Sequence, residues 1–370
     1  MLSLVAALSA GNCALIKPSE VAPASAAIIE KIVKEYLDGD CVKVVQGAVP
    51  ETTALLRLHW DHIIYTGNGA VARVVMRAAS KHLTPCTLEL GGKSPVYVDK
   101  SAKLSVAVKR LLAGKGMNNG QTCIAPDHVF VHEAVQEAFL KELLSTLRAF
   151  YGENPRTSAS YGRIVNHRHW DRVARLMKPE SHKGQVLCGG LDKSVREDKY
   201  IAPTVILNPS LDSPLMSEEI FGFVLPVITV KGVEQAIERV ASGEHPLALY
   251  VFSEDQAVTD KVLQGTTSGG VCVNDTLYHI VNPYLPFGGI GSSGMGAYHG
   301  KHGFVEMSHK KAVMYRSTFI DAAFRYPPYS DKTANALKGF AAKEPMDPNT
   351  KKLIMTAAAA AFGAVVMSRL

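Results

Sequence analysis

The sequence lacks the features that mark several common classes of protein. Its six cysteines form no CxxC pair and no disulfide-like cluster, which favours free thiols in a reducing compartment. Although the net charge is +6, no long block of Lys and Arg is present, and we expect no binding to RNA or DNA. No internal repeat of fixed period is found, so we expect no repeat architecture, and we predict no metal site.

The sequence also lacks an apolar run of the length that a membrane-spanning helix needs. The nearest approach is 353–367, where Thr356 is the only polar residue and basic residues stand on both sides. A full span takes about 20 residues, whereas runs of about 10–14 are more often buried or interfacial. We predict a tail anchor or a membrane-associated helix over 351–370, with a helix packed on the rest of the chain as the alternative.

The N-terminal residues lack the basic segment that opens a secretory signal peptide. Residues 1–8 are apolar apart from Ser3 and lead directly into a predicted strand. We therefore expect the chain to begin inside a domain.

What is present is enough apolar sequence for a large core. Of the 370 residues, 47% are hydrophobic, which indicates two or more domains. Predicted strands and helices alternate through the first part of the chain, and this pattern predicts an α/β fold with a parallel sheet and crossover helices. Ser19 can cap the first of these helices. The predicted strands are 12–17, 41–46 and 61–66, and the predicted helices are 22–37, 51–58 and 70–82.

Two residues within 84–125 can carry out chemistry together. Glu89 lies in Leu-Glu-Leu-Gly-Gly-Lys, and Cys123 follows 34 residues later in Gly-Gln-Thr-Cys. A thiol can attack a carbonyl carbon and form a covalent adduct, and a carboxylate can then activate water to release the product. An isolated glutamate is usually a surface residue and an isolated cysteine a small buried hydrophobe, so the motifs decide between these interpretations.

A second motif offers Glu89 a different role. Gly67, Asn68, Gly69 and Ala72 fit a relaxed dinucleotide-binding fingerprint between a predicted strand and a predicted helix. Small residues let the backbone approach a pyrophosphate, and the helix N-terminus supplies N–H groups. An acidic residue about 20 positions after such a turn binds the ribose, and Glu89 stands there. From the residues alone, Glu89 is either a cofactor ligand or a catalytic base.

The two motifs around Glu89 and Cys123, in this order and at this spacing, resemble the active site of the aldehyde dehydrogenase superfamily. Thr-Pro at 84–85 and Ala-Pro at 125–126 are similar to the class 3 branch, which includes the fatty aldehyde dehydrogenases. The resemblance implies that Cys123 is the nucleophile and Glu89 the general base. It leaves the ribose contacts to other residues.

Further motifs extend the resemblance along the chain. Lys-Pro-Ser-Glu at 17–20 implies contacts with the adenosine ribose, and Glu-Glu-Ile-Phe-Gly at 218–222 implies contacts with the nicotinamide ribose and ring. The glycine-rich loop 286–296 implies a phenylalanine in the catalytic pocket, and a predicted strand over 269–275 enters the same side. The implied cofactor-binding residues are Lys17, Glu20, Gly67, Asn68, Gly69, Ala72, Glu219 and Phe221, and the substrate-pocket residues are Asn274 and Phe287.

The resemblance implies an aldehyde dehydrogenase-like α/β fold with two Rossmann-like parallel-sheet domains and an oligomerisation arm. Residues 304–314 alternate apolar and polar side chains and predict the strand of this arm, which pairs with a partner subunit in the family. The predicted parts are a partial dinucleotide-binding domain at 1–88, a catalytic domain at 89–283, the active-site loop and oligomerisation arm at 284–329, a polar linker at 330–350 and an apolar tail at 351–370.

From this resemblance we predict oxidation of an aldehyde, medium- or long-chain or aromatic, to the carboxylic acid through a thioester on Cys123. The predicted cofactor is NAD, with NADP as the alternative. We predict a homodimer that is intracellular and held at a membrane by its tail, with the catalytic part in the cytosol; the alternative is a cytoplasmic protein.

One family feature is missing from the sequence. In the family, an asparagine in a Pro-Trp-Asn segment holds the oxyanion, and this chain contains no such segment, so we expect the N-terminal part of the family fold to be lacking. Loss of one oxyanion donor typically lowers the rate by about 10²–10³. The alternative functions are therefore a catalytically impaired, membrane-associated homologue that acts as a partner subunit, and a thioester hydrolase that uses Cys123 and Glu89.

Overall fold

The computed structural model describes residues 2–319, 321 and 325–341. The chain divides into two units, Met1–His309 and Lys310–Leu370. The second unit contains helix α13 (Asp331–Ala341), so a helix occupies the first part of the predicted linker. The predicted tail at 351–370 lies outside the described residues. Within the described ranges, every helix is too short or too polar to span a lipid bilayer.

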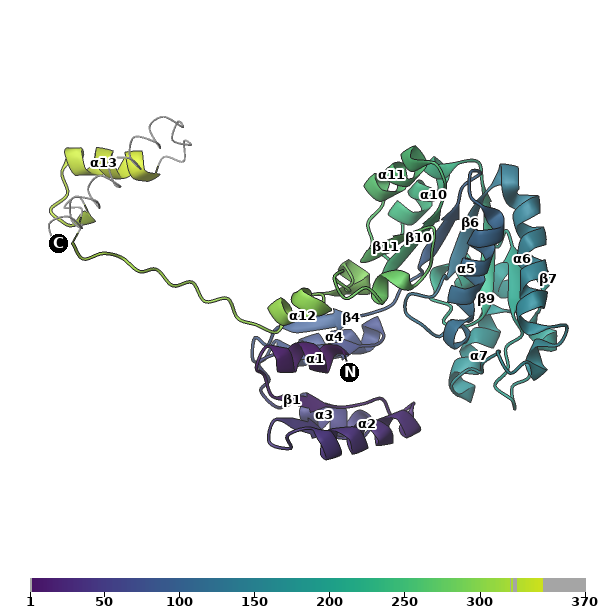
Figure 1. The fold of residues 1–370 in the computed structure, drawn as a ribbon, viewed down its shortest axis with the longest axis horizontal. Helices are drawn as coiled ribbons and strands as arrows, with labels where there is room; N and C mark the ends of the chain where they lie inside the picture. The colour runs from purple at the N-terminus through teal and green to yellow at the C-terminus, as the bar shows by residue number, and fades with distance from the viewer. Residues whose placement is uncertain (1, 320, 322–324, 342–370) are drawn as a thin grey trace, which may run out of the picture. The chain divides into compact units, whose positions relative to one another are not determined.

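Seven strands form the largest sheet of the first unit (Figure 1). Their order is β11-β10-β5-β6-β9-β8-β7, and all neighbours are parallel except β7 and β8. Parallel neighbours need long crossover connections, and most of these contain helices here. The strands are β5 (Pro95–Val98), β6 (His128–His132), β7 (Gln185–Cys188), β8 (Thr204–Leu207), β9 (Val224–Val230), β10 (Ala248–Phe252) and β11 (Gly270–Val273).

Helices cover both faces of this sheet, which is why its central strands are almost entirely apolar. The residues of β5 alternate in direction: Val96 and Val98 pack in one core with α5 and α6, and Tyr97 packs in a second core with α10 and α11. Figure 1 shows these two pairs of helices on opposite sides of the strands. The helices of this part are α5 (Leu104–Gly116), α6 (Gln136–Tyr151), α7 (His167–Leu176), α8 (Pro179–His182), α9 (Pro214–Ser217), α10 (Val233–Ala241) and α11 (Gln256–Gly265).

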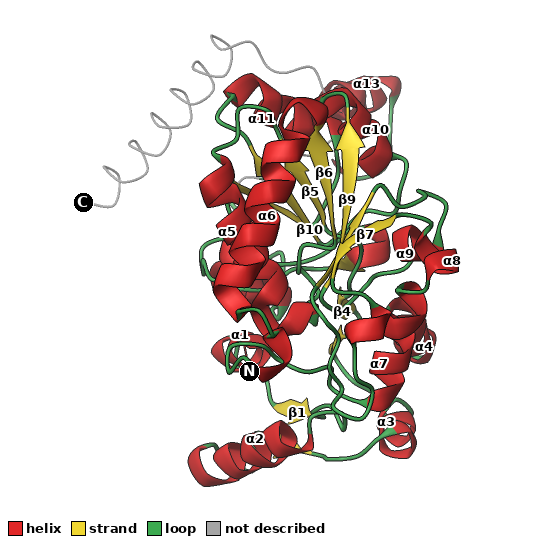
Figure 2. Ribbon diagram, turned by 90° about the vertical axis from the view of Figure 1, so that its right-hand side faces the viewer, coloured by secondary structure: helices red, strands yellow, loops and turns green. Residues whose placement is uncertain are grey.

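The strand that ends in Glu89 belongs to a separate three-stranded sheet with the order β12-β4-β3. Strand β4 is parallel to β3 and antiparallel to β12. Helix α4 packs on this sheet through Ala72 and Val75, which join Leu88 in a small core. In Figure 2 the arrow of β9 in the large sheet points away from β4. The elements are β3 (Ile63–Thr66), α4 (Gly69–Ala79), β4 (Cys86–Glu89) and β12 (Gly294–Met295).

The first two strands form a third, two-stranded parallel sheet. A small core of Leu4, Val33 and Val42 joins it to the surrounding helices. The elements are α1 (Leu2–Ser9), β1 (Ala14–Ile16), α2 (Pro23–Tyr36), β2 (Val42–Val44) and α3 (Val49–Leu55). The predicted α/β class is confirmed, but the strands of the first part lie in two small sheets rather than in one parallel sheet.

Two local predictions are wrong. Instead of a strand over 304–314, the described chain forms helix α12 (Gly300–Glu306) followed by residues without a strand. A strand needs a hydrogen-bonding neighbour, whereas Met307 here completes the helix by donating its N–H to Gly303 O at 3.0 Å. Ser19 does not cap α2, because the helix begins at Pro23, whose restricted φ suits the first helical turn.

Candidate active site

Three of the sequence motifs lie directly before neighbouring strands of the large sheet. Residues 88–93 precede β5, residues 120–126 precede β6, and residues 218–222 precede β9. Because β5, β6 and β9 are adjacent and parallel, their N-terminal ends lie side by side. The segments that lead into these strands therefore meet at that end of the sheet. The fold therefore brings together three motifs that are far apart in the sequence.

Glu89 is held in place by the backbone on both sides of its strand. It pairs with Thr66 of β3 and with Gly294 of β12. Its carbonyl oxygen accepts from the N–H of Gly67 at 3.0 Å, and the next residue, Leu90, donates to Ser293 O at 3.0 Å. The turn after β3 and the glycine-rich loop thus converge on the same residue.

The carboxyl group of Glu89 is buried. The residue is 2% exposed, and neither side-chain oxygen has a hydrogen-bond partner among the described residues. Burial, and then the nearby Glu306 carboxylate, raise the pKa of Glu89 to about 8. A carboxyl group with a raised pKa and no structural contact is suited to proton transfer.

Glu306 is a site residue that the sequence analysis missed. Thr87 Oγ1 donates to Glu306 Oε1 at 2.8 Å and lies 2.8 Å from His62 Nε2. A Cβ at Gly296 would collide with the Glu306 carboxylate, so the glycine makes room for it. Glu306 comes from α12, where a strand was predicted, and its closeness to Glu89 follows from the tertiary structure alone.

The loop that carries Cys123 is fixed from several sides. Asn118 and Asn119 adopt left-handed φ angles of 50° and 58° before it. The side chain of Gln121 donates to Asn118 O and to Arg163 O, each at 2.9 Å. After the cysteine, the buried Tyr250 hydroxyl donates to Ile124 O at 2.5 Å. These contacts hold the cysteine at the start of β6.

The Cys123 thiol is partly buried and packs against the main core of the large sheet. Burial, and then the carboxylates of Glu219 and Glu89, raise the pKa of the thiol to about 11. The structure thus brings Cys123, Glu89 and Glu219 close enough for their charges to interact. A thiol with this pKa is protonated at neutral pH and needs a base or a positive charge to react.

Phe287 and Tyr298 border the same site. Each donates its backbone N–H to the carbonyl oxygen of the other at 2.9 Å, and the ring of Phe287 stacks on His299 with 5.6 Å between the ring centres. Burial, and then the charges of Glu89 and Cys123, raise the pKa of Tyr298 to about 12. Phe287 is thus joined by hydrogen bonds to Tyr298, and its place in the substrate pocket stays a prediction.

Glu219 lies against the glycines that follow Glu89. A Cβ at Gly91 would collide with the Glu219 carboxylate, and the backbone of Gly92 forms a hydrogen bond with it. Burial, and then Asp127, raise the pKa of Glu219 to about 7. Phe221, which was predicted to bind the cofactor together with Glu219, is partly buried and has a left-handed φ of 49°.

A buried ion pair, also missed by the sequence analysis, ties the three motifs together. Lys93 Nζ lies 2.5 Å from Asp127 Oδ1 and donates to Leu215 O at 2.9 Å and Glu218 O at 2.8 Å. The other oxygen of Asp127 accepts from the N–H of Ile220 at 2.9 Å. Lys93 ends the Leu-Glu-Leu-Gly-Gly-Lys motif and Asp127 directly follows Ala-Pro at 125–126, but their pairing depends on the neighbouring positions of β5, β6 and β9.

Lys17 and Glu20 lie together just after β1. Lys17 Nζ donates to Glu20 Oε2 at 3.3 Å and to Gly47 O at 2.9 Å. Glu20 is exposed, and a hydrogen bond from its own backbone, then one from Lys17, lower its pKa. An ammonium and a carboxylate side by side can bind ribose hydroxyl groups, which both accept and donate hydrogen bonds.

The predicted phosphate turn lies at the N-terminus of α4. Gly67 and Asn68 are exposed, and Asn68 caps the helix because its Oδ1 accepts from Val71 N at 3.0 Å. The helix begins at Gly69. Ala72, by contrast, is only 2% exposed and lies on the face of α4 that packs against Leu88 and Leu90, so its side chain supports the turn from the core.

Asn274 is used for structure. Its Nδ2 donates to Ser253 O, and its Oδ1 accepts from Ser253 N, each at 2.9 Å. Its left-handed φ of 56° ends β11. Because Ser253 occupies both ends of the amide, we leave Asn274 out of the proposed substrate pocket.

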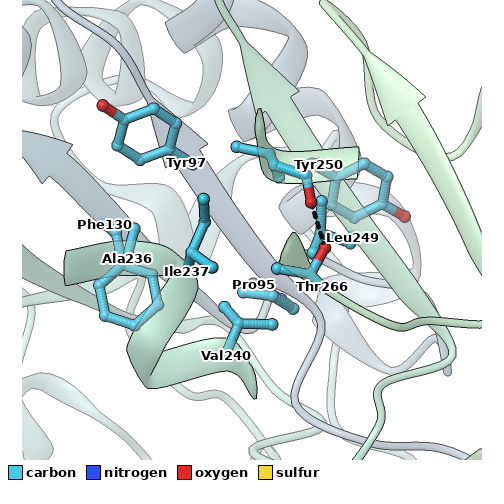
Figure 3. Close-up of a pocket in the computed structure, with 10 residues that line it drawn as sticks. Pro95, Tyr97, Phe130, Ala236, Ile237, Val240, Leu249, Tyr250 and Thr266 are labelled. Carbon is cyan, nitrogen blue, oxygen red and sulfur yellow. Dashed lines mark hydrogen bonds between the residues drawn. The ribbon is translucent and has the colours of Figure 1, made fainter. Parts of the chain in front are cut away.

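A small apolar pocket lies between the large sheet and helices α10 and α11 (Figure 3). Thr266 at its rim donates to Val262 O at 2.6 Å. Neither Glu89 nor Cys123 lines it, so we assign it to helix packing. The lining residues are Pro95, Tyr97, Phe130, Ala236, Ile237, Val240, Leu249, Tyr250, Val262 and Thr266.

Comparisons with known proteins agree on one family. Residues 1–313 match the aldehyde dehydrogenase family. The chain is 46% identical over 336 residues to aldehyde dehydrogenase family 3 member H1 of Arabidopsis thaliana, an alignment that covers 90% of this chain and 69% of that protein. It is 48% identical over 328 residues to the dimeric NADP-preferring aldehyde dehydrogenase of Rattus norvegicus, with coverages of 88% and 71%.

A solved structure also resembles this fold. The substrate-bound state of Staphylococcus aureus AldH aligns with a TM-score of 0.85 and 42% sequence identity. The alignment covers 92% of this chain and 73% of that chain.

Proposed function

The chain belongs to the aldehyde dehydrogenase family, and on this premise we propose that it oxidises an aldehyde to the carboxylic acid through Cys123 and Glu89. Its cofactor is NAD or NADP. The observation that supports the two residues best is the Glu89 carboxyl, which is 2% exposed and lacks a hydrogen-bond partner among the described residues. After burial and Glu219, its charge is the third cause that raises the pKa of the Cys123 thiol. A nucleophile beside a free base is the arrangement that covalent catalysis uses.

The proposed reaction begins with proton transfer from Cys123 to Glu89. Glu89 is a stronger base than an ordinary carboxylate because its pKa is about 8. The thiolate then attacks the aldehyde carbon, and the backbone N–H of Cys123 holds the developing oxyanion. Conversion of this adduct to a thioester requires a hydride acceptor, which NAD or NADP supplies when bound.

Glu89 also serves the second half of the proposed reaction. After losing its proton to solvent, it accepts a proton from a water molecule that attacks the thioester. The acid leaves, and the sulfur of Cys123 is restored as a thiol. One carboxyl group in two roles explains why no structural contact occupies it.

The residues present fit a dinucleotide at two places. Lys17 and Glu20 suit the adenosine ribose, and the exposed N-terminus of α4 suits a pyrophosphate because it combines free N–H groups with a positive dipole end. On the other side, the Glu219 carboxylate beside Gly91 suits the diol of the nicotinamide ribose. We propose that Phe221 would lie beside the nicotinamide ring.

We further propose an apolar aldehyde, medium- or long-chain or aromatic, because the aromatic rings of Phe287 and Tyr298 border the site. A homodimer is proposed from the relative that is described as dimeric. A membrane anchor in 351–370 stays a prediction of the sequence, since those residues lie outside the described part of the chain.

The test is aldehyde-dependent reduction of NAD or NADP by the full chain, in which the absorbance of the reduced cofactor is monitored. We expect Cys123→Ala to abolish it, while Cys188→Ala, which removes a thiol elsewhere in the fold, leaves it unchanged. Reduction that survives in Cys123→Ala would show that the nucleophile is misassigned. Ester hydrolysis without cofactor, in the absence of aldehyde oxidation, would favour the thioester hydrolase, and inactivity of the folded wild-type chain would favour the catalytically silent partner subunit.

A further inference from the structure

Two cysteines lie next to each other at the start of the two-stranded sheet, outside the proposed active site. Ala14 of β1 pairs with Val42 of β2, so the residues before them, Cys13 and Cys41, are the next positions in the same parallel ladder. The N–H of Ala14 donates to Cys41 O at 2.9 Å, so the hydrogen bonding extends to the second cysteine. Neighbouring strands lie about 4.8 Å apart, within the Cα separation of about 4.4–6.8 Å that disulfides tolerate.

Equivalent positions of paired parallel strands project their side chains to the same face of a sheet, so the two thiols are neighbours. A hydrogen bond with the Cys13 thiol, followed by burial, raises the pKa of Cys41. Cys41 Sγ donates to Asn12 O at 3.7 Å, so this sulfur lies beside the peptide bond that leads into Cys13. Cys13 is exposed and Cys41 is partly buried, so a reagent in solution meets Cys13 first.

Backbone contacts hold both cysteines in position. The N–H of Cys41 donates to Asp38 O at 3.1 Å, within the turn that begins β2. Asn12, next to Cys13, donates from Nδ2 to Met307 O at 2.9 Å. Both cysteines therefore belong to segments whose backbone is held by hydrogen bonds, and these bonds keep them at neighbouring positions of the ladder.

We propose that Cys13 and Cys41 are a reversible thiol–disulfide switch that reacts with a small disulfide such as oxidised glutathione. The thiolate of Cys13 attacks one sulfur of the small disulfide, forms a mixed disulfide and releases one small thiolate. Cys41 then loses its proton, and its sulfur attacks Cys13 Sγ and displaces the second small thiol. Two protein thiols are oxidised and one small disulfide is reduced to two thiols, and an excess of small thiol reverses the exchange.

The bond would fasten the sheet that carries Lys17. It joins the starts of β1 and β2, and beyond the far ends of the same strands Lys17 Nζ donates to Gly47 O at 2.9 Å. The loop that it closes contains the whole of α2. Closing such a loop restricts the unfolded chain, so the oxidised form is expected to unfold at a higher temperature than the reduced form.

The test is incubation of the full chain with oxidised glutathione, followed by alkylation of free thiols, tryptic digestion without reductant and mass spectrometry. We expect peptides 1–31 and 35–43 to be recovered as one cross-linked species, in the monomer band of a non-reducing gel, and to separate after treatment with dithiothreitol. Cys13→Ser and Cys41→Ser are each expected to remove the cross-link and the rise in unfolding temperature. Cys188→Ser, the control, is expected to keep both.

Two results would overturn the proposal. One is recovery of Cys13 and Cys41 only as alkylated thiols or as separate mixed disulfides with glutathione, which would show that the sulfur atoms do not combine. The other is a cross-link found only in a dimer band, which would show that the bond joins two copies of the chain. Neither readout depends on the proposed enzymatic function.

Discussion

Two buried carboxyl groups, one before β5 and one before β6, meet opposite conditions in this protein. Glu89 is 2% exposed and has no hydrogen-bond partner among the described residues, and burial followed by Glu306 raises its pKa to about 8. Asp127 is 3% exposed but forms an ion pair with Lys93. Although burial alone would raise the pKa of Asp127, Lys93 and then His128 outweigh it and hold that pKa well below the usual range.

The difference teaches that burial by itself does not decide what a carboxyl group does. A buried carboxylate that is paired and hydrogen-bonded stays ionised and stabilises the segments that it joins. A buried carboxyl without a partner is kept near the pH at which it can gain or lose a proton, which is typical of a catalytic group. We therefore expect changes at Glu89 to affect turnover and changes at Asp127 to affect folding.

Replacement of Glu89 with glutamine carries the largest expected effect. Turnover with aldehyde is expected to fall by roughly 10²–10⁴, the usual contribution of a general base. The free energy of unfolding is expected not to fall, because glutamine has the same shape and removes a charge that burial disfavours. Cofactor reduction and denaturant unfolding measure the two effects, with Glu137→Gln on the exposed face of α6 as the control. If Glu89→Gln kept normal turnover but lost stability, Glu89 would have the structural role that we assign to Asp127.

Replacement of Asp127 with asparagine tests the structural side. We expect a loss of about 3–5 kcal/mol in the free energy of unfolding, because the partly buried ammonium of Lys93 loses its counterion. Asp171→Asn breaks an exposed pair with Arg196 and is expected to lower stability by about 0–1 kcal/mol. Equal losses in the two variants, measured by denaturant unfolding, would contradict the role given to burial.

Tyr250→Phe tests whether the Cys123 loop depends on its second anchor. The buried carbonyl of Ile124 loses its donor, so we expect a loss of about 1–3 kcal/mol in stability together with lower turnover. Tyr97→Phe removes a buried hydroxyl that donates to Asp99 at 3.1 Å, on the same sheet but away from the cysteine. It is expected to lower stability without lowering turnover, and a matching loss of turnover would argue against a specific role for Tyr250.

The smallest expected effect is on the pH dependence of thioester hydrolysis. Glu89 must be unprotonated to accept a proton from water, so the rate is expected to rise with pH through about 8. Glu306→Gln removes a negative charge that raises the pKa of Glu89, so the rise is expected at lower pH. The pH at which the rate rises is expected to move by less than the full rise in the pKa of Glu89, from 4.5 to about 8, because burial is the larger cause of that rise. Single-turnover rates across pH measure it.

The same pKa has a consequence for stability. A carboxyl whose pKa is raised on folding favours the folded state below its ordinary value of 4.5, and this contribution is lost as the pH rises through about 8. Wild type is therefore expected to lose stability relative to Glu89→Gln across this range. Glu254→Gln, on an exposed loop, serves as the control for both pH experiments. If Glu306→Gln and this control gave identical pH–rate profiles, the charge of Glu306 would not affect the pKa of Glu89.

Much of the local structure could be predicted from neighbouring residues. Helix α2 occupies Pro23–Tyr36 where 22–37 was predicted, because apolar spacing and a proline near its start are local signals. The strand over 304–314 was wrong because a short alternation of apolar and polar residues also fits a helix, and a strand depends on a partner that local sequence does not reveal. The same limit explains why Lys93, Asp127 and Glu306 had no predicted role.

The sequence by itself determined which reactive groups this protein has and which motifs carry them, because a thiol, a carboxyl group and a glycine turn depend on residue identity and near neighbours. Only the tertiary structure decided that, within the part of the chain it describes, the Glu89 carboxyl has no hydrogen-bond partner while Asp127 is paired. That outcome follows from the placing of β5, β6 and β9 side by side, which brings Lys93 to Asp127, and from the position of β4 in a separate sheet. Burial and pairing are properties of these packed neighbours, and they move the pKa of two similar groups in opposite directions.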